Sequence, residues 1–596
     1  MSILKKLNYI FSKKQKFQSV LLCVGLFIGA LFELMGVSLI TGLVSIITNP
    51  ETIHNNALLK RVYDGFHMQS DREFYAFATA ALILVYLVKN IFLLWLNYVQ
   101  YTFIYDNQLL ISGRLIDCYL KKPYTYHLDK NSAEMVRNVM LDSERLFQML
   151  LSVFSLLSEL LVCVLLCIYL LVVDWFITVF VVAILAVFTG LYMLLFKNKA
   201  KEYGKINQIY DGKMHQSINQ ALGAVKDIKI LHREKYFVNA FTDYGKEKMR
   251  AVRNNNVLGN VPKYTIETAC IGAILSVLLI KLNQGADINS MITQLAAFAV
   301  AAFKLLPSVS KINNYANLII FLKPSVDLIY RDIKDTEDML TFELADEASE
   351  AEPAADSAQG SRTAAATTDA RDEDTKAIVV DHVSYRYPNS EPLVLKDVCF
   401  EIPIGAAVGI VGQSGAGKST IADIILGILT PVSGEVRYGT MNVHKHPLKW
   451  SKKLAYIPQA IYLSDETIRN NVAFGIEEEE IDEGKVWEAL KEAQLYDFVK
   501  GLKEGLNTVV GERGVRLSGG QRQRIGIARA LYDDPEILVL DEATSALDNE
   551  TEAAVMEAID HLMGRKTLII IAHRLTTIEN CQMVFRIEAG KVFRER

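Results

Sequence analysis

The chain has 596 residues with a formal net charge of -5 at pH 7, and 51% of its residues are hydrophobic. This length exceeds a single domain, and the near balance of 63 basic and 68 acidic residues gives no reason to expect nucleic acid as a partner. The 7 cysteines have no paired spacing, so neither a disulfide framework nor a zinc site is predicted.

The first 340 residues predict a membrane domain. Lysines cluster between positions 5 and 16, and the apolar stretch that follows is longer than the core of a signal peptide. We therefore expect a first membrane helix with its basic flank in the cytoplasm. A helix needs about 20 apolar residues to cross a bilayer. Six segments meet this requirement: 18–47, 74–105, 148–173, 175–198, 255–281 and 289–323.

The charge of the connecting segments predicts their side of the membrane. Segments 106–147 and 199–254 are rich in Lys and Arg, whereas 48–73 and 282–288 are poorer. By the positive-inside rule, the long connections and both termini lie in the cytoplasm. Apolar residues recur at helical spacing through 205–245, so these connections are predicted to continue the helices.

A change in composition marks the next boundary. Residues 343–376 are dominated by Ala, Glu, Asp, Ser and Thr, which cannot bury a core, and we interpret them as a flexible linker. The sequence thus predicts a transmembrane domain over 1–342, a linker over 343–376 and a soluble α/β domain over 377–596.

The soluble domain carries a phosphate-binding loop of the pattern G-x-x-x-x-G-K-[ST]. Its glycines let backbone N–H groups turn toward phosphate oxygens, and the following helix adds partial positive charge. Lys418 is expected to reach the β- and γ-phosphates, and Ser419 to ligate Mg²⁺. The predicted ATP-binding residues of the loop are Gly412, Gln413, Ser414, Gly415, Ala416, Gly417, Lys418, Ser419 and Thr420.

Two carboxylates follow a second apolar run, 537–540. Such a run suits a strand buried on both faces of a parallel sheet. Asp541 at its end is predicted to orient the Mg²⁺ shell, and Glu542 to polarise the attacking water. ATP and Mg²⁺ are therefore the predicted cofactors.

Between these motifs stands the run Leu517, Ser518, Gly519, Gly520 and Gln521. With it, nearly the whole chain resembles the ABC transporters of the exporter type. The resemblance implies that Tyr387 stacks on adenine, that Gln459 meets Mg²⁺ and faces the membrane domain, and that His573 contacts the γ-phosphate. It also implies that segments 121–135 and 218–234 couple the two halves.

The resemblance further implies a dimer. In this family Ser518 and Gly520 would contact ATP bound to the opposite subunit, through a helix N-terminus aimed at the γ-phosphate. One chain has one phosphate-binding loop and one signature, so it needs a second copy to complete a nucleotide site. Because each chain has Glu542 and His573, both sites of a homodimer would be competent to hydrolyse ATP. The expected fold is a six-helix, all-α transmembrane domain followed by an α/β ABC ATPase domain. The expected location is the bacterial inner membrane, with the ATPase domain in the cytoplasm.

Four lysines inside the predicted spans bear on the cargo. A charge in hydrocarbon is costly, so these side chains should face protein or water. Around one cavity of a dimer they would suit an anionic cargo. The four candidate cargo-binding residues are Lys89, Lys263, Lys304 and Lys311. The alternative is structural pairing with the intramembrane acids Glu33, Glu159 and Glu267.

The helices around these lysines resemble those of the PglK-type bacterial flippases of lipid-linked oligosaccharides. That family has Arg at the matching places, and lysine lacks the bidentate fork of arginine. The leading hypothesis is ATP-driven flipping of a polyprenyl-pyrophosphate-linked oligosaccharide, or a similar anionic glycolipid, from the inner to the outer leaflet. The alternatives are export of lipid A, a drug or a peptide, and an ATP-gated channel or sensor.

Overall fold

A computed structural model describes residues 3–48, 53, 56–68, 70–173, 175–283, 288–351, 377–388, 390–542, 549–572 and 574–596. Side chains of residues 277–304 and 340–351 are also outside this description. The chain divides into two compact units. The first holds Met1–Lys122 and Lys130–Leu344, and the second holds Pro123–Asp129 and Ala345–Arg596.

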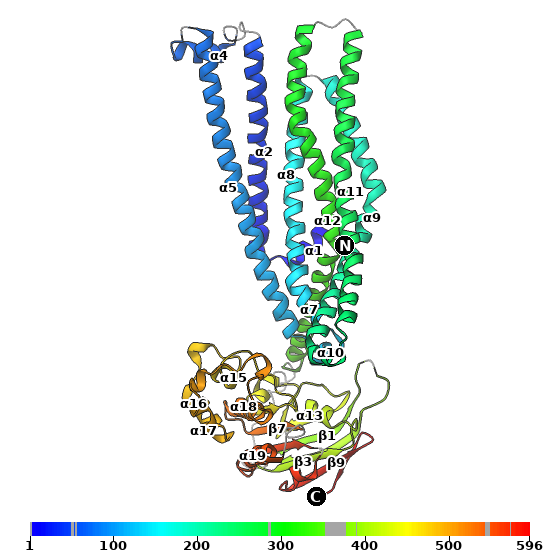
Figure 1. The fold of residues 1–596 in the computed structure, drawn as a ribbon, viewed down its shortest axis with the longest axis vertical. Helices are drawn as coiled ribbons and strands as arrows, with labels where there is room; N and C mark the ends of the chain where they lie inside the picture. The colour runs from blue at the N-terminus through cyan, green and yellow to red at the C-terminus, as the bar shows by residue number, and fades with distance from the viewer. Residues whose placement is uncertain are drawn as a thin grey trace, which may run out of the picture. The chain divides into compact units, whose positions relative to one another are not determined.

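The first unit is built from long helices that run side by side (Figure 1). Within the described ranges, six helices exceed 30 residues: α2 (Lys13–Thr48), α5 (Asp71–Leu120), α8 (Ser143–Val173), α9 (Trp175–Gly223), α11 (Glu234–Asn283) and α12 (Ile288–Ala351). The shorter elements are α1 (Ile3–Ile10), α4 (Ala57–Gly65), α7 (Ser132–Arg137), the π-helical turn η1 (Asn138–Asp142) and α10 (Val225–Leu231).

Among the described residues, four helices are long and apolar enough to cross a membrane. They cover Lys13–Ile47, Asp71–Leu120, Ser132–Val173 and Thr178–Gly223. The last two predicted spans fall in α11 and α12, whose side chains are only partly described. Helix continues to Leu120 in α5 and to Gly223 in α9, and it resumes through α10 and α11. The predicted helical continuation of the long connections is therefore confirmed.

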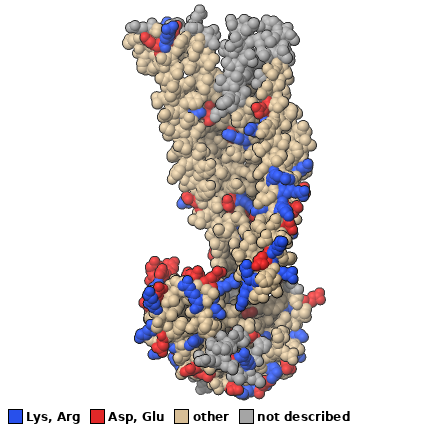
Figure 2. All heavy atoms as spheres, in the orientation of Figure 1, with Lys and Arg blue, Asp and Glu red and all other residues tan. Residues whose placement is uncertain are grey.

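An apolar core holds the membrane helices together. Leu166 of α8, Ile266 of α11 and Leu305 of α12 are buried against Ala30 and Val37 of α2. Many large apolar side chains instead point outward, such as Leu194, which is 83% exposed. On the face drawn in Figure 2, the helical unit is largely free of charge over much of its length. An apolar exterior of this kind suits contact with lipid tails.

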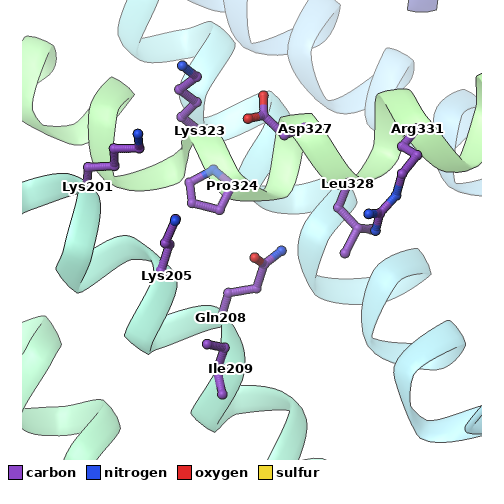
Figure 3. A pocket seen from close by; sticks show the side chains of 9 residues that line it. All are labelled: Lys201, Lys205, Gln208, Ile209, Lys323, Pro324, Asp327, Leu328 and Arg331. Carbon is purple, nitrogen blue, oxygen red and sulfur yellow. The ribbon is translucent and has the colours of Figure 1, made fainter.

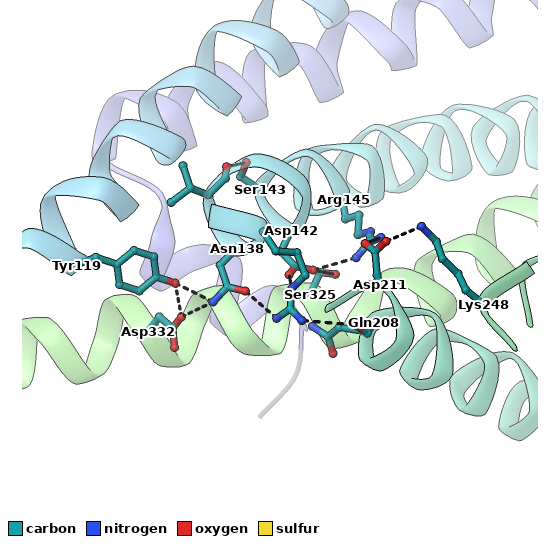
Figure 4. Close-up of polar contacts among 12 residues, drawn as sticks. Tyr119, Asn138, Asp142, Ser143, Arg145, Gln208, Asp211, Lys248, Ser325 and Asp332 are labelled. Atoms are coloured by element: carbon teal, nitrogen blue, oxygen red, sulfur yellow. Dashed lines mark hydrogen bonds and ion pairs between the residues drawn. The ribbon is translucent and has the colours of Figure 1, made fainter. Parts of the chain in front are cut away.

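A buried polar network joins residues of η1, α5, α8, α9 and α12 (Figure 4). Asp142 of η1 is fully buried and accepts hydrogen bonds from Arg137 at 3.1 Å, from Arg145 at 3.3 Å and from Ser325. Arg145 also binds Asp211 of α9 at 2.6 Å. These bonds join η1, α8, α9 and α12, and each buried charge has a partner, as a low-dielectric interior requires.

The other end of the network is centred on Asp332 of α12. Its carboxylate accepts from Tyr119 of α5 at 2.6 Å and from the amide of Asn138 at 3.3 Å. The π-helical turn therefore places both of its end residues, Asn138 and Asp142, in one network. As a result, buried hydrogen bonds link α12 to α5 and to both ends of this turn.

The second unit contains two sheets. A six-stranded sheet has the order β10-β9-β3-β8-β7-β6, in which only the β10–β9 pair is antiparallel. A four-stranded antiparallel sheet has the order β2-β1-β4-β5. The strands are β1 (Ala377–Tyr385), β2 (Leu395–Pro403), β3 (Ala407–Gly412), β4 (Ser433–Tyr438), β5 (Met441–Asn442), β6 (Leu454–Ile457), β7 (Ile537–Asp541), β8 (Thr567–Ile571), β9 (Met583–Glu588) and β10 (Lys591–Arg594).

Helices cover the six-stranded sheet. Strands β3, β7 and β8 are buried nearly throughout, as their continuous apolar runs require. The helices of this unit are α6 (Tyr124–Asp129), α13 (Lys418–Ile425), α14 (Pro447–Ser451), α15 (Ile468–Val472), α16 (Glu483–Glu492), α17 (Tyr496–Lys500), α18 (Gly519–Leu531) and α19 (Asn549–Asp560), with 3-10 turns η3 (Glu478–Glu480), η4 (Gly505–Asn507), η5 (Glu512–Gly514) and η6 (Leu575–Ile578). Of the predicted linker, residues 343–351 lie in α12, and residues 352–376 lie outside the described part of the chain.

Candidate nucleotide site and cargo cavity

The candidate nucleotide site lies at the carboxyl ends of β3, β8 and β7, which are neighbours in the parallel sheet. In open α/β sheets, ligands bind at this edge because the loops that leave the strands converge there. The phosphate-binding loop follows β3, and Asp541 closes β7. The fold therefore brings the loop 412–420 and Asp541, which follows the end of the loop by 121 positions, to one edge.

The loop has the backbone that its glycines allow. Gly415 has φ +78° and Gly417 has φ +107°, which L side chains rarely adopt. A Cβ atom at Gly417 would also lie 2.9 Å from Cδ2 of Leu395. This positive-φ turn leads straight into α13, so the first free N–H groups of the helix lie beside the loop.

Lys418 is held inside the loop. Its side chain is buried, and Nζ donates hydrogen bonds to the carbonyl oxygens of Gly412 at 2.9 Å and of Gln413 at 3.2 Å. Burial lowers the pKa of Lys418. The loop thus presents a cation with few solvent contacts, and the phosphates of a nucleotide would offer it charged acceptors in place of neutral carbonyls.

The other predicted loop residues surround this lysine. Thr420 is buried, and its hydroxyl lies 3.1 Å from the phenol oxygen of Tyr387. Tyr387 also meets the ring of Tyr385 edge-on, with ring centroids 5.2 Å apart. The predicted adenine-stacking residue is therefore fixed at the first turn of α13. The outward-facing residues of the loop are Gln413, Ser414, Gly415 and Ser419, and Gly412 and Ala416 are half-buried.

The oxygen atoms of Asp541 and Ser419 form the candidate Mg²⁺ site. The hydroxyl of Ser419 is hydrogen-bonded to the carboxylate of Asp541, and Tyr456 lies 3.5 Å from the same carboxylate. Burial and the neighbouring charge of Glu542 raise the pKa of Asp541. Hard carboxylate and hydroxyl oxygens beside a phosphate loop are the donors that Mg²⁺ prefers, so the residues present fit this ion.

Gln459 and Glu542 are in direct contact. The side-chain amide of Gln459 donates a hydrogen bond of 2.7 Å to the carboxylate of Glu542. Glu542 has a strained backbone with φ +48°, and its N–H donates to the carbonyl of Ile571 at 3.0 Å. Two predicted site residues, 83 positions apart, are thus joined at the edge of the sheet. His573, which follows β8 after Ala572, lies outside the described residues.

The signature run forms the start of α18. The hydroxyl of Ser518 accepts from the N–H of Gln521 at 3.2 Å, and the side chain of Gln521 accepts from the N–H of Ser518 at 2.9 Å. This reciprocal capping box fixes the helix N-terminus. Leu517 anchors the turn in the apolar core, while Ser518 and Gly519 are exposed and Gly520 is buried.

Of the four lysines in the predicted spans, two have carboxylate partners among the described residues. Nζ of Lys89 lies 3.2 Å from the carboxylate of Glu33, and Nζ of Lys311 lies 2.9 Å from that of Glu159. They differ in exposure, because the Lys89 side chain is 4% exposed and that of Lys311 is 55% exposed. The side chain of Lys304 lies outside the described residues.

Lys311 and Lys263 share a cavity between α11 and α12. Its volume is about 480 Å³, and Glu267, Leu306 and Pro307 also line it. The side chain of Asn314 packs against Gly259 beside this cavity, since a Cβ atom on Gly259 would lie 2.8 Å from Oδ1 of Asn314. Two of the candidate cargo lysines thus open into one space, and the buried Lys89 is engaged with α2 instead.

Both units of the chain match families of known proteins. Residues 395–545 match the family model described as ABC transporter, and residues 35–261 match the model described as ABC transporter transmembrane region. The chain is 30% identical over 493 residues to an ATP-dependent lipid A-core flippase of Cupriavidus metallidurans, covering 82% of this chain and 78% of the relative. The chain belongs to the ABC transporter family. A similar flippase of Burkholderia pseudomallei is 28% identical over 90% of the chain and 86% of its own length.

A solved structure supports the fold of this ABC transporter. The structure of a bacterial Atm1-family ABC exporter with ATP bound matches with a TM-score of 0.75 at 20% identity, covering 96% of this chain and 94% of that one. The expected fold, a helical membrane domain followed by an α/β nucleotide-binding domain, is confirmed. The protein is an ABC exporter that binds ATP and couples its hydrolysis to transport across a membrane.

The structure adds residues to the ATPase site that the motifs did not reveal. Asp423 of α13 lies near Asp541, and burial together with that charge raises its pKa to about 6. Arg529 of α18 donates to the carbonyls of Asn471 at 2.8 Å and Tyr462 at 2.8 Å, and so ties the loop after Gln459 to the signature helix. Asp423 stands five positions after Lys418, but only the fold shows that it meets Asp541.

Proposed function

We propose that this ABC transporter works as a homodimer that flips an anionic, phosphate-bearing glycolipid from the inner to the outer leaflet of the bacterial inner membrane. The cargo phosphate would bind Lys263 and Lys311 in the cavity between α11 and α12. The observation that carries this proposal is the 55% exposure of the Lys311 side chain inside a predicted membrane span. A cation at that depth is costly unless water or an anion accompanies it. Glu159 is the partner of Lys311 here, and the exposed part of the lysine would be open to a cargo phosphate.

The charges around the cavity support an anionic ligand. The cavity contains both Lys263 and Lys311, with Glu267 as the acid that also lines it. Glu159 pairs with Lys311, while Nζ of Lys263 lies 5.5 Å from the ring centroid of Tyr264. Lys263 therefore brings a positive charge that a phosphate oxygen would neutralise.

Lys89 has a different proposed role. It is buried, paired with Glu33 and stacked 4.4 Å from the ring centroid of Tyr86. Its interactions with the described residues lie between α2 and α5, so we assign it to structural pairing. Lys304 remains a candidate for cargo binding, as predicted from the sequence.

Two kinds of glycolipid carry the phosphate groups that these lysines are proposed to bind. A polyprenyl-pyrophosphate-linked oligosaccharide carries its phosphates between lipid and sugar, which agrees with lysines placed inside the spans. The relatives at 28–30% identity are named as ATP-dependent lipid A-core flippases, which favours lipid A with its core sugars. Both are anionic lipids with bulky glycans, and we propose cargo of this class.

The proposed ATPase cycle uses two chains. The loop residues 412–420 and Tyr387 would hold ATP, and Ser419, Gln459 and Asp541 would hold Mg²⁺, which would neutralise phosphate charge. Leu517–Gln521 of the partner copy would close over the γ-phosphate with a helix N-terminus. Glu542 would polarise the attacking water and His573 would contact the γ-phosphate. Closing and releasing this clamp would alternate the opening of the helical unit.

The test is transport by proteoliposomes that hold the purified full chain. We expect ATPase stimulation and vectorial movement with one phosphorylated glycolipid, and a loss of about tenfold or more in cargo affinity for Lys263→Gln/Lys311→Gln. Lys235→Gln, an exposed lysine of α11, is the matched control and should behave like the wild type. Unchanged cargo affinity in the double variant would reject the cationic cavity. Unchanged stimulation by a glycolipid from which the phosphates have been removed would reject the cargo class.

A further inference from the structure

A second basic cavity lies between α9 and α12, at the ends of their apolar segments (Figure 3). Its volume is about 360 Å³. Lys201 and Lys205 of α9 face it from one side, and Lys323 and Arg331 of α12 line the other. We call this space the basic cleft. The sites considered so far do not use any of these four cations.

Close helix packing builds the basic cleft. A Cβ atom on Gly204 would lie 2.2 Å from the carbonyl oxygen of Phe321, so the two helix backbones nearly touch at this point. Lys201 and Lys205 flank Gly204 on α9, and Lys323 follows Phe321 by two residues on α12. A side chain at position 204 would separate the helices and thereby move the two sets of cations apart.

The charge of the basic cleft is not balanced by its own acids. Asp327 also lines it, but its carboxylate already forms an ion pair of 2.9 Å with Lys6. Among the described residues, no carboxylate lies within ion-pair distance of Lys201, Lys205, Lys323 or Arg331. The amide nitrogen of Gln208, which also lines the cleft, is buried and donates to no acceptor in the described ranges. Four cations and a buried amide donor along one cleft favour an anion that accepts many hydrogen bonds.

The position of the basic cleft indicates the source of that anion. The apolar part of α9 ends at Phe196, and Lys201 follows about 7 Å further along the helix. The apolar run Leu318–Leu322 of α12 ends directly before Lys323. Both helices thus pass from an apolar run to a segment with charged residues at this level, which under the proposed orientation is the headgroup region of the inner leaflet.

We propose that the basic cleft binds the phosphate of an anionic phospholipid of the inner leaflet, and that its occupancy sets the basal ATPase rate. Basic pockets between membrane helices on the cytoplasmic side recognise such headgroups. The site is separate from the cargo cavity, because Lys323 follows Lys311 by twelve residues, about 18 Å along α12. A headgroup there would bridge α9 and α12 through its phosphate oxygens. This inference rests on the proposed membrane orientation but not on the identity of the cargo.

The test uses the full chain in lipid nanodiscs, with two readouts. Nanodiscs of phosphatidylcholine alone are compared with nanodiscs that also contain phosphatidylglycerol or cardiolipin. We expect the wild type to retain the anionic lipid in native mass spectrometry after transfer to detergent, and to hydrolyse ATP at a different basal rate when that lipid is present. For Lys201→Gln/Lys323→Gln we expect roughly tenfold or more weaker retention and loss of the rate difference.

Matched variants separate the site from general charge effects. Lys199→Gln removes an exposed lysine near the same level of α9 that does not line the cleft, and it should retain the lipid like the wild type. Lys201→Arg/Lys323→Arg keeps the charge and should retain it as well, which guards against misfolding in the Gln variant. Equal retention by the wild type and the Gln variant would overturn the proposal.

Two further measurements identify the source of the phosphate and distinguish lipid binding in the basic cleft from binding of the proposed cargo. Inorganic phosphate and glycerol phosphate at matched concentration should displace the lipid only weakly, and binding of free phosphate without any lipid retention would overturn a lipid site. Cargo stimulation in phosphatidylcholine nanodiscs should survive Lys201→Gln/Lys323→Gln but not Lys263→Gln/Lys311→Gln. Failure of the cargo hypothesis therefore leaves the basic cleft separately testable.

Discussion

The side-chain amide of Gln459 donates a 2.7 Å hydrogen bond to the carboxylate of Glu542. The bond occupies the carboxylate that we propose polarises the attacking water. Gln459 is also the residue proposed to meet Mg²⁺, so a shift of Gln459 toward the metal would release Glu542 for water. If both proposed roles hold, this hydrogen bond would link the state of the metal site to the availability of the general base.

Replacing Glu542 by Gln tests this role. The neutral amide retains the shape of the side chain but cannot accept a proton, so we expect ATP hydrolysis to fall by about 10²-fold or more while ATP binding persists. The measurement is steady-state ATPase activity beside binding of a fluorescent ATP analogue. Glu579→Gln, an exposed acid after η6, is the control. Rapid turnover in Glu542→Gln would refute the assignment.

Asp423 should make stability depend on pH. Its pKa rises from 3.8 to about 6 in the folded chain, so between about pH 4 and pH 6 the folded state holds a proton that the unfolded state has released. Stability therefore falls as pH rises through this window and levels off above it. Asp423→Asn should remove this slope and stabilise the protein near pH 7 by about 1 kcal/mol, allowing for solvent screening.

Thermal unfolding of the full chain across this pH range measures the effect. Asp533→Asn removes an exposed carboxylate of the same unit and should leave the slope in place. An identical pH profile for Asp423→Asn and the wild type would show that Asp423 does not carry the proton.

Gly204→Ala should loosen the contact between α9 and α12. The added Cβ would overlap the carbonyl of Phe321 at 2.2 Å, so the helices must shift, at a cost of about 1–3 kcal/mol. Gly113→Ala on α5 is the matched control, because a Cβ there has nothing within 4 Å and should stabilise the helix by about 1 kcal/mol. Thermal unfolding in detergent compares the two, and equal or greater stability of Gly204→Ala would contradict the close approach.

Asp142→Asn should weaken the buried network around η1. Asp142 is fully buried and accepts from two arginines and Ser325, so a neutral amide leaves positive charge uncompensated, at a cost of about 2–4 kcal/mol. Asp243→Asn breaks the exposed pair with Lys246 and should change stability by less than about 1 kcal/mol. A similar melting temperature for both variants would show that the network adds nothing to stability.

The local sequence was enough to predict the elements of the nucleotide-binding unit, because its motif residues lie in short runs that follow one another in a fixed order. The glycines of 412–417 dictate the positive-φ loop, the apolar run 537–540 dictates a buried strand, and Ser518 with Gln521 dictates a helix cap. Apolar length likewise predicted the four helices of the described residues that are long and apolar enough to cross a membrane, because a span needs one continuous run and no distant partner. The resemblance to ABC transporters followed from these runs in order.

Only the tertiary structure decided which charges meet. The sequence placed Lys89 and Lys311 alike within predicted spans, yet the first is buried on Glu33 and the second opens into a cavity. It gave no sign that Asp423 approaches Asp541, or that Gly204 brings Lys201 beside Lys323. The free energy of a charge depends on the dielectric and on partners contributed by other helices and strands, and only the packing of those elements sets both.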